Sequence, residues 1–345
     1  MKTDPHTELR TPGNRPPVPV TILTGFLGSG KTTLLNHIVS ANLRLRVAVL
    51  VNDFGAINID AKLVVGVEGE TISLANGCVC CTMRDDLATE TVRLLSRPDP
   101  PEYIVIEASG ISDPGLIAHT YLDSELAVLV RVDSIIAVVD TDQLPELRNE
   151  DLHLALDQIS VADIVILNKI DLVSRDQLND VCDRLRSLVP EARLLTAIMA
   201  QVPMALILGV DADRTEHGVA DHQHTDHHHA YSTWSWSSEH PVSLPALRAV
   251  VGELPDSVYR SKGILQLREY PQYSVEFQLA GKRSSLSATG LWGHESPRSE
   301  LVMIGTFNGS DTDALQDRLD ACTRELAQEL SFVDWRKKRR NFVGR

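Results

Sequence analysis

The feature that most constrains this chain of 345 residues is a glycine-rich stretch near its N-terminus. It runs from Gly25 to Thr32 and fits the pattern G-x-x-x-x-G-K-[ST]. An apolar, β-branched run over 18–23 precedes it, and a run of helical character over 33–39 follows it. A strand, a glycine-rich turn and a helix in this order surround a phosphate with backbone N–H groups and a helix N-terminus. The stretch therefore predicts a site for a nucleoside triphosphate.

The motif also predicts roles for its polar residues. We expect Lys31 to contact the β- and γ-phosphates and the Thr32 hydroxyl to bind Mg²⁺, so both belong to the predicted catalytic machinery. The other residues expected around the phosphates belong to the loop and the first helical turn: Gly25, Gly28, Ser29, Gly30 and Thr33.

Two further segments place acidic residues after strand-like apolar runs. One run ends at Glu107, where a phosphate-loop protein places its Mg²⁺-associated acid, and Gly110 could donate its N–H to the γ-phosphate. The other run, over 47–51, precedes Asp53 and Asp60, whose carboxylates could face Mg²⁺, water or a second metal. We therefore expect Glu107 and Asp53 to act in catalysis.

A tetrapeptide after another apolar run predicts which base is bound. The run over 162–167 leads into Asn168, Lys169, Ile170 and Asp171, which fit N-K-x-D. The Asp171 carboxylate can accept hydrogen bonds from the N1–H and the exocyclic amine of guanine, a pattern that adenine does not offer. Asn168 is expected to support the loop and Lys169 to lie along the base. GTP is therefore predicted, and an ATP-dependent kinase of a small metabolite is the alternative.

Three of the five cysteines form a cluster at Cys78, Cys80 and Cys81, ahead of a helix expected to begin near Met83. Clustered thiolates bind Zn²⁺, Cu⁺ and related soft cations. Three ligands leave one tetrahedral position open, which suits a site that releases its metal. A redox pair and buried structural cysteines are the alternatives. The other two cysteines lie on apolar helical stripes and are predicted to be core residues.

A change of composition divides the chain. The segment from Asp211 to Tyr231 lacks apolar periodicity and is rich in acids and histidines, so it predicts a linker. It is either a plain linker or an arm that collects metal with low affinity through its imidazoles. The candidate ligands in this arm are His222, His224, His227, His228 and His229.

The pattern of runs predicts two folded domains. Residues 18–210 should form an α/β phosphate-loop GTPase domain with a mainly parallel sheet and helices on both faces. Residues 232–345 should form a smaller α+β domain, and residues 1–17 a disordered leader.

Charge and hydropathy exclude several classes of partner. The net charge of −14 makes the chain a poor ligand for nucleic acid or an anionic membrane. No run of about 18 apolar residues is present, and the first 17 residues contain no apolar signal core. We therefore expect a cytoplasmic protein with no membrane or nucleic-acid partner.

Together these motifs resemble the CobW-type family of metal-handling GTPases, a branch of the SIMIBI class of phosphate-loop proteins. The resemblance extends into the C-terminal region through segments 260–263 and 298–305. It implies GTP hydrolysis coupled to delivery of Zn²⁺, Co²⁺ or another metal to a client protein. At the first switch, this chain has Asp53 where relatives commonly have Glu.

The motifs suggest how nucleotide and metal are coupled. GTP with Mg²⁺ would favour the switch geometry that brings Cys78, Cys80 and Cys81 together, and hydrolysis would release the metal to the client. No Gln or Arg can be assigned to the attacking water, so slow turnover stimulated by a client or a homodimer partner is expected. The alternatives are a GTPase chaperone with a structural zinc and a His-rich storage protein.

Overall fold

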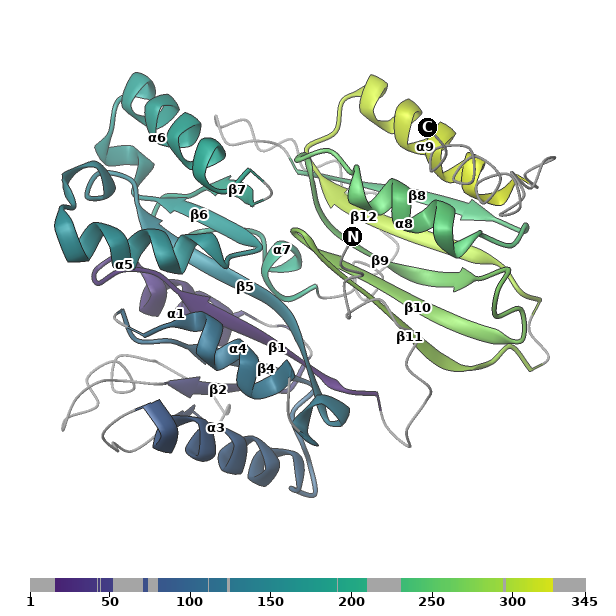
Figure 1. Cartoon of the computed structure of the whole chain (residues 1–345), viewed down its shortest axis with the longest axis horizontal. Coiled ribbons are helices and arrows are strands. Elements are labelled where there is room, and N and C mark those ends of the chain that lie inside the picture. The colour runs from purple at the N-terminus through teal and green to yellow at the C-terminus, as the bar shows by residue number, and fades with distance from the viewer. Residues whose placement is uncertain are drawn as a thin grey trace, which may run out of the picture.

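The structure is a computed structural model, and two sheets organise the part of the chain that it describes (Figure 1). The first sheet has seven strands and the second has five. The described residues are 16–41, 43, 45–51, 71–73, 80–110, 112–122, 125–190, 192–209, 231–293 and 296–324.

The first sheet is entirely parallel, with the strand order β3-β2-β4-β1-β5-β6-β7. Its strands are β1 (Val18–Thr24), β2 (Val47–Val51), β3 (Thr71–Ser73), β4 (Tyr103–Glu107), β5 (Val130–Asp140), β6 (Ile164–Asn168) and β7 (Arg193–Thr196). Every residue of β4 and β6 is buried. Continuous apolar runs are typical of parallel strands that helices cover on both sides, so the runs found in the sequence become the centre of this sheet.

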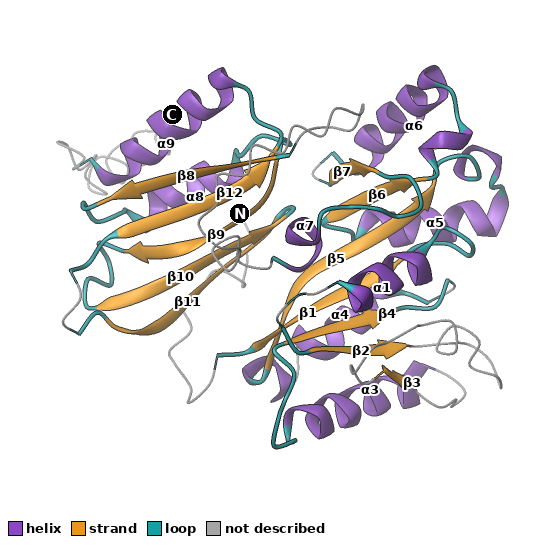
Figure 2. Cartoon of the chain, turned by 180° about the vertical axis from the view of Figure 1, so that it is seen from behind, coloured by secondary structure: helices purple, strands orange, loops and turns teal. Residues whose placement is uncertain are grey.

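Helices cover both faces of this sheet (Figure 2). They are α1 (Lys31–Ser40), α3 (Cys80–Leu95), α4 (Pro114–Leu122), α5 (Asn149–Ser160), α6 (Arg175–Leu188) and the short α7 (Met204–Leu208). On one face, α1 and α7 pack on Leu23, Val105 and Val138. On the other face, α3 and α4 pack on Ile22 of β1 and Ile104 of β4. On the same face, α5 and α6 pack on Val165 of β6. The predicted α/β class with helices on both faces is confirmed.

The second sheet is antiparallel, with the order β11-β10-β9-β12-β8. Its strands are β8 (Ser232–Ser238), β9 (Val258–Gln266), β10 (Tyr273–Ala280), β11 (Arg283–Leu291) and β12 (Ser299–Gly305). Two helices, α8 (Leu244–Gly252) and α9 (Gly309–Thr323), share a core with it that includes Trp236, Phe277 and Leu301. The predicted α+β class of the C-terminal domain is therefore confirmed.

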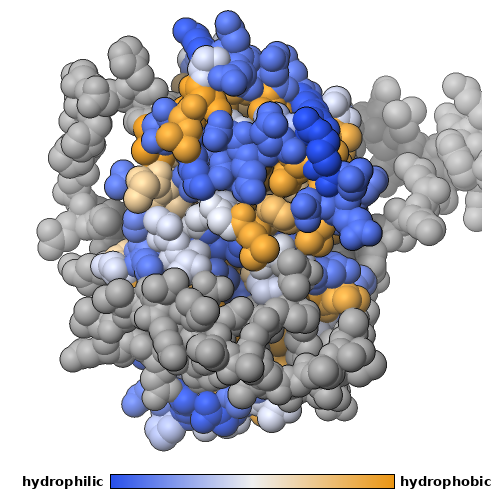
Figure 3. Space-filling view, turned by 90° about the vertical axis from the view of Figure 1, so that its left-hand side faces the viewer, coloured by the Kyte–Doolittle hydropathy of each residue, from blue (hydrophilic) through white to orange (hydrophobic). Residues whose placement is uncertain are grey.

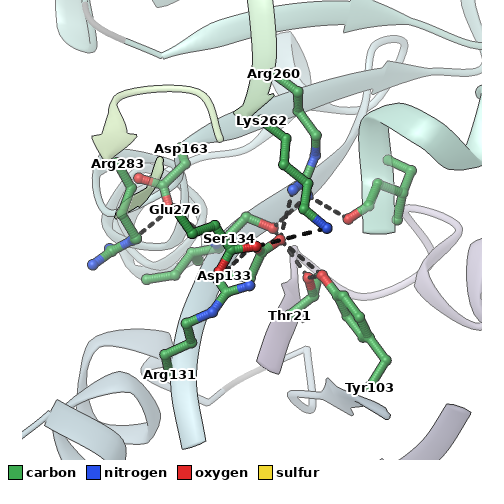
Figure 4. A network of polar contacts seen from close by, with 12 residues as sticks. Thr21, Tyr103, Arg131, Asp133, Ser134, Asp163, Arg260, Lys262, Glu276 and Arg283 are labelled. Carbon is green, nitrogen blue, oxygen red and sulfur yellow. Dashed lines mark hydrogen bonds and ion pairs between the residues drawn. The ribbon is translucent and has the colours of Figure 1, made fainter. Parts of the chain in front are cut away.

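A buried polar network joins the two sheets, and Figure 4 shows Arg260 and Tyr103 converging on Asp133. The Nη1 of Arg260, on β9, donates to Oδ2 of Asp133, on β5, at 2.6 Å. The Tyr103 hydroxyl donates to the same Oδ2 at 2.8 Å, and burial raises the pKa of this hydroxyl well above its usual value. The other donors of the guanidinium bond to Ser134 Oγ and to the carbonyls of Leu206 and Ile207. The buried charge of Arg260 is therefore paired, as a buried charge must be.

Two further ion pairs cross the same interface. Arg193 at the start of β7 pairs with Asp256, and Arg283 on β11 donates from Nε to Oδ2 of Asp163 at 3.1 Å. The turn at Gly281 approaches so closely that a Cβ there would lie 2.1 Å from the Asp163 carbonyl oxygen. The ion-pair partners in the first domain lie in the amino-terminal parts of β5 and β7 and directly before β6. The carboxyl ends of the parallel strands, where ligands bind in such sheets, therefore lie away from the interface.

Two smaller observations complete the fold. Cys322 is buried in the C-terminal core and Cys182 packs against the first domain's core, as predicted for both. Within the described ranges, no helix has the length and apolar character needed to cross a bilayer.

Candidate functional site

The glycine-rich loop lies between β1 and α1, and its backbone conformation requires glycine at two positions. Gly25 and Gly30 have φ angles of 137° and 109°, which side chains other than hydrogen rarely permit. A Cβ on Gly25 would lie 2.1 Å from the Val138 carbonyl oxygen, and one on Gly30 would lie 2.4 Å from Asn168 Nδ2. Because α1 begins at the next residue, Lys31, the free N–H groups of its first turn adjoin this loop.

The Lys31 side chain folds back into the loop. Its Nζ donates to the carbonyl oxygens of Gly25 at 2.8 Å and Phe26 at 3.0 Å, and the residue is 8% exposed. A fixed ammonium beside a helix N-terminus favours an anion at this place. The arrangement is suited to the phosphates of a nucleotide.

Thr32 and Glu107 come together although 75 residues separate them. The Thr32 hydroxyl donates to Glu107 Oε1 at 2.9 Å, joining the first turn of α1 to the end of β4. The two meet because β1 and β4 are paired with Leu23 opposite Glu107. A hydroxyl and a carboxylate are hard oxygen ligands of the kind that Mg²⁺ prefers, so these two residues fit that ion.

The turn after Glu107 packs against the phosphate loop. Ala108 N donates to the Leu23 carbonyl at 2.8 Å, and the Ser109 and Ser112 hydroxyls lie 2.9 Å apart. A Cβ on Gly110 would lie 2.6 Å from Leu27 Cδ2 in the phosphate loop. The predicted γ-phosphate contact, Gly110, therefore lies directly beside the loop.

Asn168 joins two loops of the site. It is 2% exposed, and its Nδ2 donates to the Ser29 carbonyl at 2.9 Å while its Oδ1 accepts from Ala200 N at 2.7 Å. Lys169 adopts a left-handed φ of 62°, and its Nζ donates to Asp140 Oδ2 at 2.6 Å. Asn168 therefore contacts both the phosphate loop and the loop that contains Ala200.

Asp171 lies in the short helix η4 (Ile170–Leu172), and its side chain is exposed. An exposed carboxylate at the carboxyl end of β6 can accept hydrogen bonds from a bound base. The loop over 196–200, which follows β7, also reaches this place, because Ile170 N donates to the Ala197 carbonyl at 3.4 Å. No sequence signature marks this loop, because it is held through backbone atoms and through left-handed φ angles at Met199 and Ala200.

Apolar side chains are exposed at this end of the sheet. Leu27, Leu172 and Met199 follow the carboxyl ends of β1, β6 and β7, and they are 56%, 59% and 64% exposed. Figure 3 shows hydrophobic residues scattered among hydrophilic residues on one face of the molecule. Apolar groups next to Asp171 are suited to the face of a purine ring.

The metal-site predictions are only partly covered by the described residues. Helix α3 begins at Cys80, not near Met83 as predicted, so Cys80 and Cys81 are its first two residues. The sequence contains no capping residue that would mark this start, which explains the error. Cys78, Asp53, Asp60 and the histidines of the linker lie outside the described residues. Among the described side chains, no group of three or more His, Cys, Asp or Glu is arranged to hold a metal ion.

Two protein-family models match this chain, and each matches a separate part of it. The family model described as CobW/HypB/UreG, nucleotide-binding domain, matches residues 19–196. The model described as cobalamin synthesis protein cobW C-terminal domain matches residues 231–323. These matches cover the parallel and the antiparallel sheet respectively.

Individual relatives match most of the chain. Zinc-regulated GTPase metalloprotein activator 1 of Dictyostelium discoideum is 30% identical, over 92% of this chain and 82% of its own. The zinc chaperone YjiA of Escherichia coli (strain K12) is 30% identical, over 84% of this chain and 94% of its own. The crystal structure of Zn(II)-bound YjiA GTPase from E. coli is similar with a TM-score of 0.43 and 23% identity, covering 90% of this chain and 100% of that chain.

Proposed function

The chain belongs to the CobW/HypB/UreG family of nucleotide-binding proteins, and from this premise we propose that it is a GTP-dependent zinc chaperone. It binds Zn²⁺, with Co²⁺ as the next candidate, and transfers the ion to a client metalloprotein as it hydrolyses GTP. The observation that carries the proposal is the hydrogen bond between Thr32 and Glu107 beside the buried Lys31. This arrangement combines a cation site with an anion site, as a magnesium–nucleotide complex requires.

The chain's own residues position the nucleotide. Lys31 and the N–H groups at the start of α1 hold the β- and γ-phosphates, and Asp171 accepts from the guanine edge. Thr32 and Glu107 would hold Mg²⁺, and the ion would supply positive charge beside the phosphates. Because Asn168 contacts both Ser29 and Ala200, the base-binding and phosphate-binding loops form one unit.

Side-chain packing between helices supports coupling between the nucleotide and the cysteines. The turn after Glu107 leads into α4, which packs against α3 through Tyr121 and Leu87 in one core. Cys80 and Cys81 begin α3. A change in the turn when the γ-phosphate is lost would thus pass through α4 to the helix that carries two of the three predicted zinc ligands.

The client and a homodimer partner are part of the proposal. The sequence motifs indicate no Gln or Arg for the attacking water, so intrinsic hydrolysis should be slow. Docking of the client, or of a second copy of the chain, would then raise the rate, which ties release of the ion to the presence of an acceptor.

Metal titration in three nucleotide states tests this function. Zn²⁺ is titrated in competition with a chromophoric chelator, with a non-hydrolysable GTP analogue, with GDP and without nucleotide. We expect the highest affinity with the analogue, by about 5- to 150-fold, and an equal rise of analogue affinity when Zn²⁺ is bound. Equal zinc affinity in all three states would refute the coupling and would leave a structural zinc site.

Matched variants identify the ligands. Replacing Cys78, Cys80 and Cys81 by Ser should abolish the tight, nucleotide-dependent site, whereas Cys182→Ser should leave it intact. Replacing the five linker histidines by Asn should remove only weak zinc binding. If the histidine variant lost most of its zinc and the cysteine variant did not, the chain would be a storage protein and not a chaperone.

A further inference from the structure

The buried side chain of Gln158 contacts the turn that follows Glu107. It is fully buried, at 0% exposure, on α5. Its Nε2 donates to the carbonyl oxygens of Gly110 at 3.0 Å and Ser112 at 3.3 Å. Because both neighbours are acceptors, the orientation of the amide is fixed: the NH₂ group faces the turn. A single side chain thus holds two carbonyls of one turn.

Other hydrogen bonds hold the two ends of the turn, and one of them joins the Ser109 and Ser112 hydroxyls. Ala108 N is held by Leu23, and Ser112 N donates to the Ser109 carbonyl at 3.0 Å. Between these points, the backbone direction at Gly110 depends on where its carbonyl is held. Since a glycine has no Cβ to limit its φ and ψ angles, the hydrogen bond from Gln158 to the Gly110 carbonyl reduces the number of conformations that this residue can adopt.

Packing does not explain why a glutamine occupies this position. Its neighbours on α5, Ala155 and Ile159, are buried apolar residues that pack on β5 and β6. Among the described residues, no donor reaches Gln158 Oε1, which is itself buried. A methionine would fill the same space without placing a polar oxygen there, so the amide is best explained by what its NH₂ group does.

We propose that Gln158 is a positioning residue for the γ-phosphate contact: it holds the carbonyls of Gly110 and Ser112 so that the Gly110 N–H faces the terminal phosphate. This inference rests on the proposed function, since it requires GTP in the site. Gln158 and Asn168 also belong to consecutive elements, because α5 leads directly into β6. Gln158 holds the turn and Asn168 holds the phosphate loop, each through a buried side-chain amide.

Two variants of similar volume test the role. Gln158→Met removes the donor, and Gln158→Glu replaces it with a carboxylate that faces two carbonyls. We measure Kd for GDP and for a non-hydrolysable GTP analogue with Mg²⁺, together with kcat and KM for GTP hydrolysis. We expect both variants to bind GDP as the wild type does, to bind the analogue about tenfold more weakly and to lose at least as much in kcat.

The glutamate variant has a further signature. A carboxyl group buried beside two carbonyls has a raised pKa, and once protonated it can donate to them again. Relative to the wild type, analogue binding by Gln158→Glu should therefore recover as the pH falls from 8 to 6. A residue that served only in packing would show no such recovery.

The control is Thr21→Val, which removes the hydrogen bonds of an equally buried side chain in the middle of β1. It should lower thermal stability without changing the ratio of analogue to GDP affinity. If the Gln158 variants behave like this control, or weaken GDP and analogue equally, the inference is wrong. Failure of the proposed function would be seen separately, as a wild type that neither hydrolyses GTP nor couples it to zinc.

Discussion

Arg260 of the C-terminal domain and Asp133 of the first domain form an ion pair with 2.6 Å between Nη1 and Oδ2, and their side chains are only 5% and 6% exposed. The pair lies at the amino-terminal part of β5 and includes the Tyr103 hydroxyl at the start of β4. Glu107 ends that same strand. One buried strand therefore runs from the domain interface to the predicted magnesium site.

Removal of Arg260 should destabilise the whole protein. In Arg260→Met, the Asp133 carboxylate would keep Tyr103 but lose its main countercharge, and breaking one partner of a buried pair costs about 3–5 kcal/mol. The free energy of unfolding from urea titration measures this loss. The matched control is Arg298→Met, whose partner Glu300 is 56% exposed, and it should change stability by less than about 1 kcal/mol. Equal effects of the two substitutions would contradict a buried, stabilising pair.

The same pair predicts a dependence of stability on pH. Burial raises the pKa of Asp133, but the charges of Arg260 and Arg131 and the hydrogen bonds outweigh it and lower this pKa from 3.8 to about 2. A lowered pKa stabilises the fold above the unfolded value, and that stability disappears as the pH falls from about 4 toward 2. Of the unfolding free energy that the wild type has over Asp133→Asn, the part that depends on this ionisation should therefore be about 2 kcal/mol at pH 5. Urea titrations at pH 5 and pH 2.5 should show this difference shrinking, whereas a constant difference would contradict it.

The sequence predicts the parts of this protein that depend on local pattern. The strand, loop and helix around Lys31 are contiguous, and Glu107 and Asn168 each follow an apolar run that becomes a buried strand. Because parallel strands bring their carboxyl ends to one edge, three distant motifs could be expected to meet. The hydrogen bond between Thr32 and Glu107 is the result.

The remaining contacts depend on long-range packing that has no local signature. Arg260 and Asp133 lie 127 residues apart, and nothing beside either residue indicates a buried charge. Gln158 falls in a helix with mixed polarity, where a glutamine ordinarily faces solvent. The loop at Ala200 is held through its backbone N–H, which any residue type supplies. These features follow from the arrangement of the two sheets and not from the identity of neighbouring residues.

Gly30→Ala should disable the phosphate loop while leaving the fold intact. An added Cβ would lie 2.4 Å from Asn168 Nδ2, and the φ of 109° is strained for alanine. Displacing Asn168 would loosen its contacts to both loops, so we expect GTP affinity to fall about tenfold or more, as measured by fluorescent-nucleotide titration. Gly252→Ala, where an added Cβ meets no atom within 4 Å, is the control and should bind GTP normally. Normal binding by Gly30→Ala would show that the loop tolerates another conformation.

Asp171→Asn should change the base that is preferred. The carboxylate accepts from the N1–H and the 2-amino group of guanine, whereas an amide NH₂ can donate to the 2-oxo group of xanthine. We expect GTP affinity to fall about 100-fold and XTP to become the better ligand in competition titrations. Because Asp171 is exposed, folding should be unaffected. The control is Asp176→Asn in the first turn of α6, and an unchanged preference in Asp171→Asn would mean that another group recognises the base.

Glu107→Gln separates the charge of this side chain from its shape. Glutamine can still accept the hydrogen bond from Thr32, so the local structure should persist and nucleotide binding without Mg²⁺ should stay near the wild-type value. The lost negative charge weakens a hard-cation site, so the Mg²⁺ concentration that half-saturates GTP hydrolysis should rise about tenfold. The control is Glu102→Gln, just before the other end of β4, where the carboxylate pairs with the exposed Arg46 at the surface. If Glu107→Gln lowered kcat at saturating Mg²⁺ without changing the half-saturating concentration, Glu107 would act on the reaction itself, and the cation would be held by other ligands.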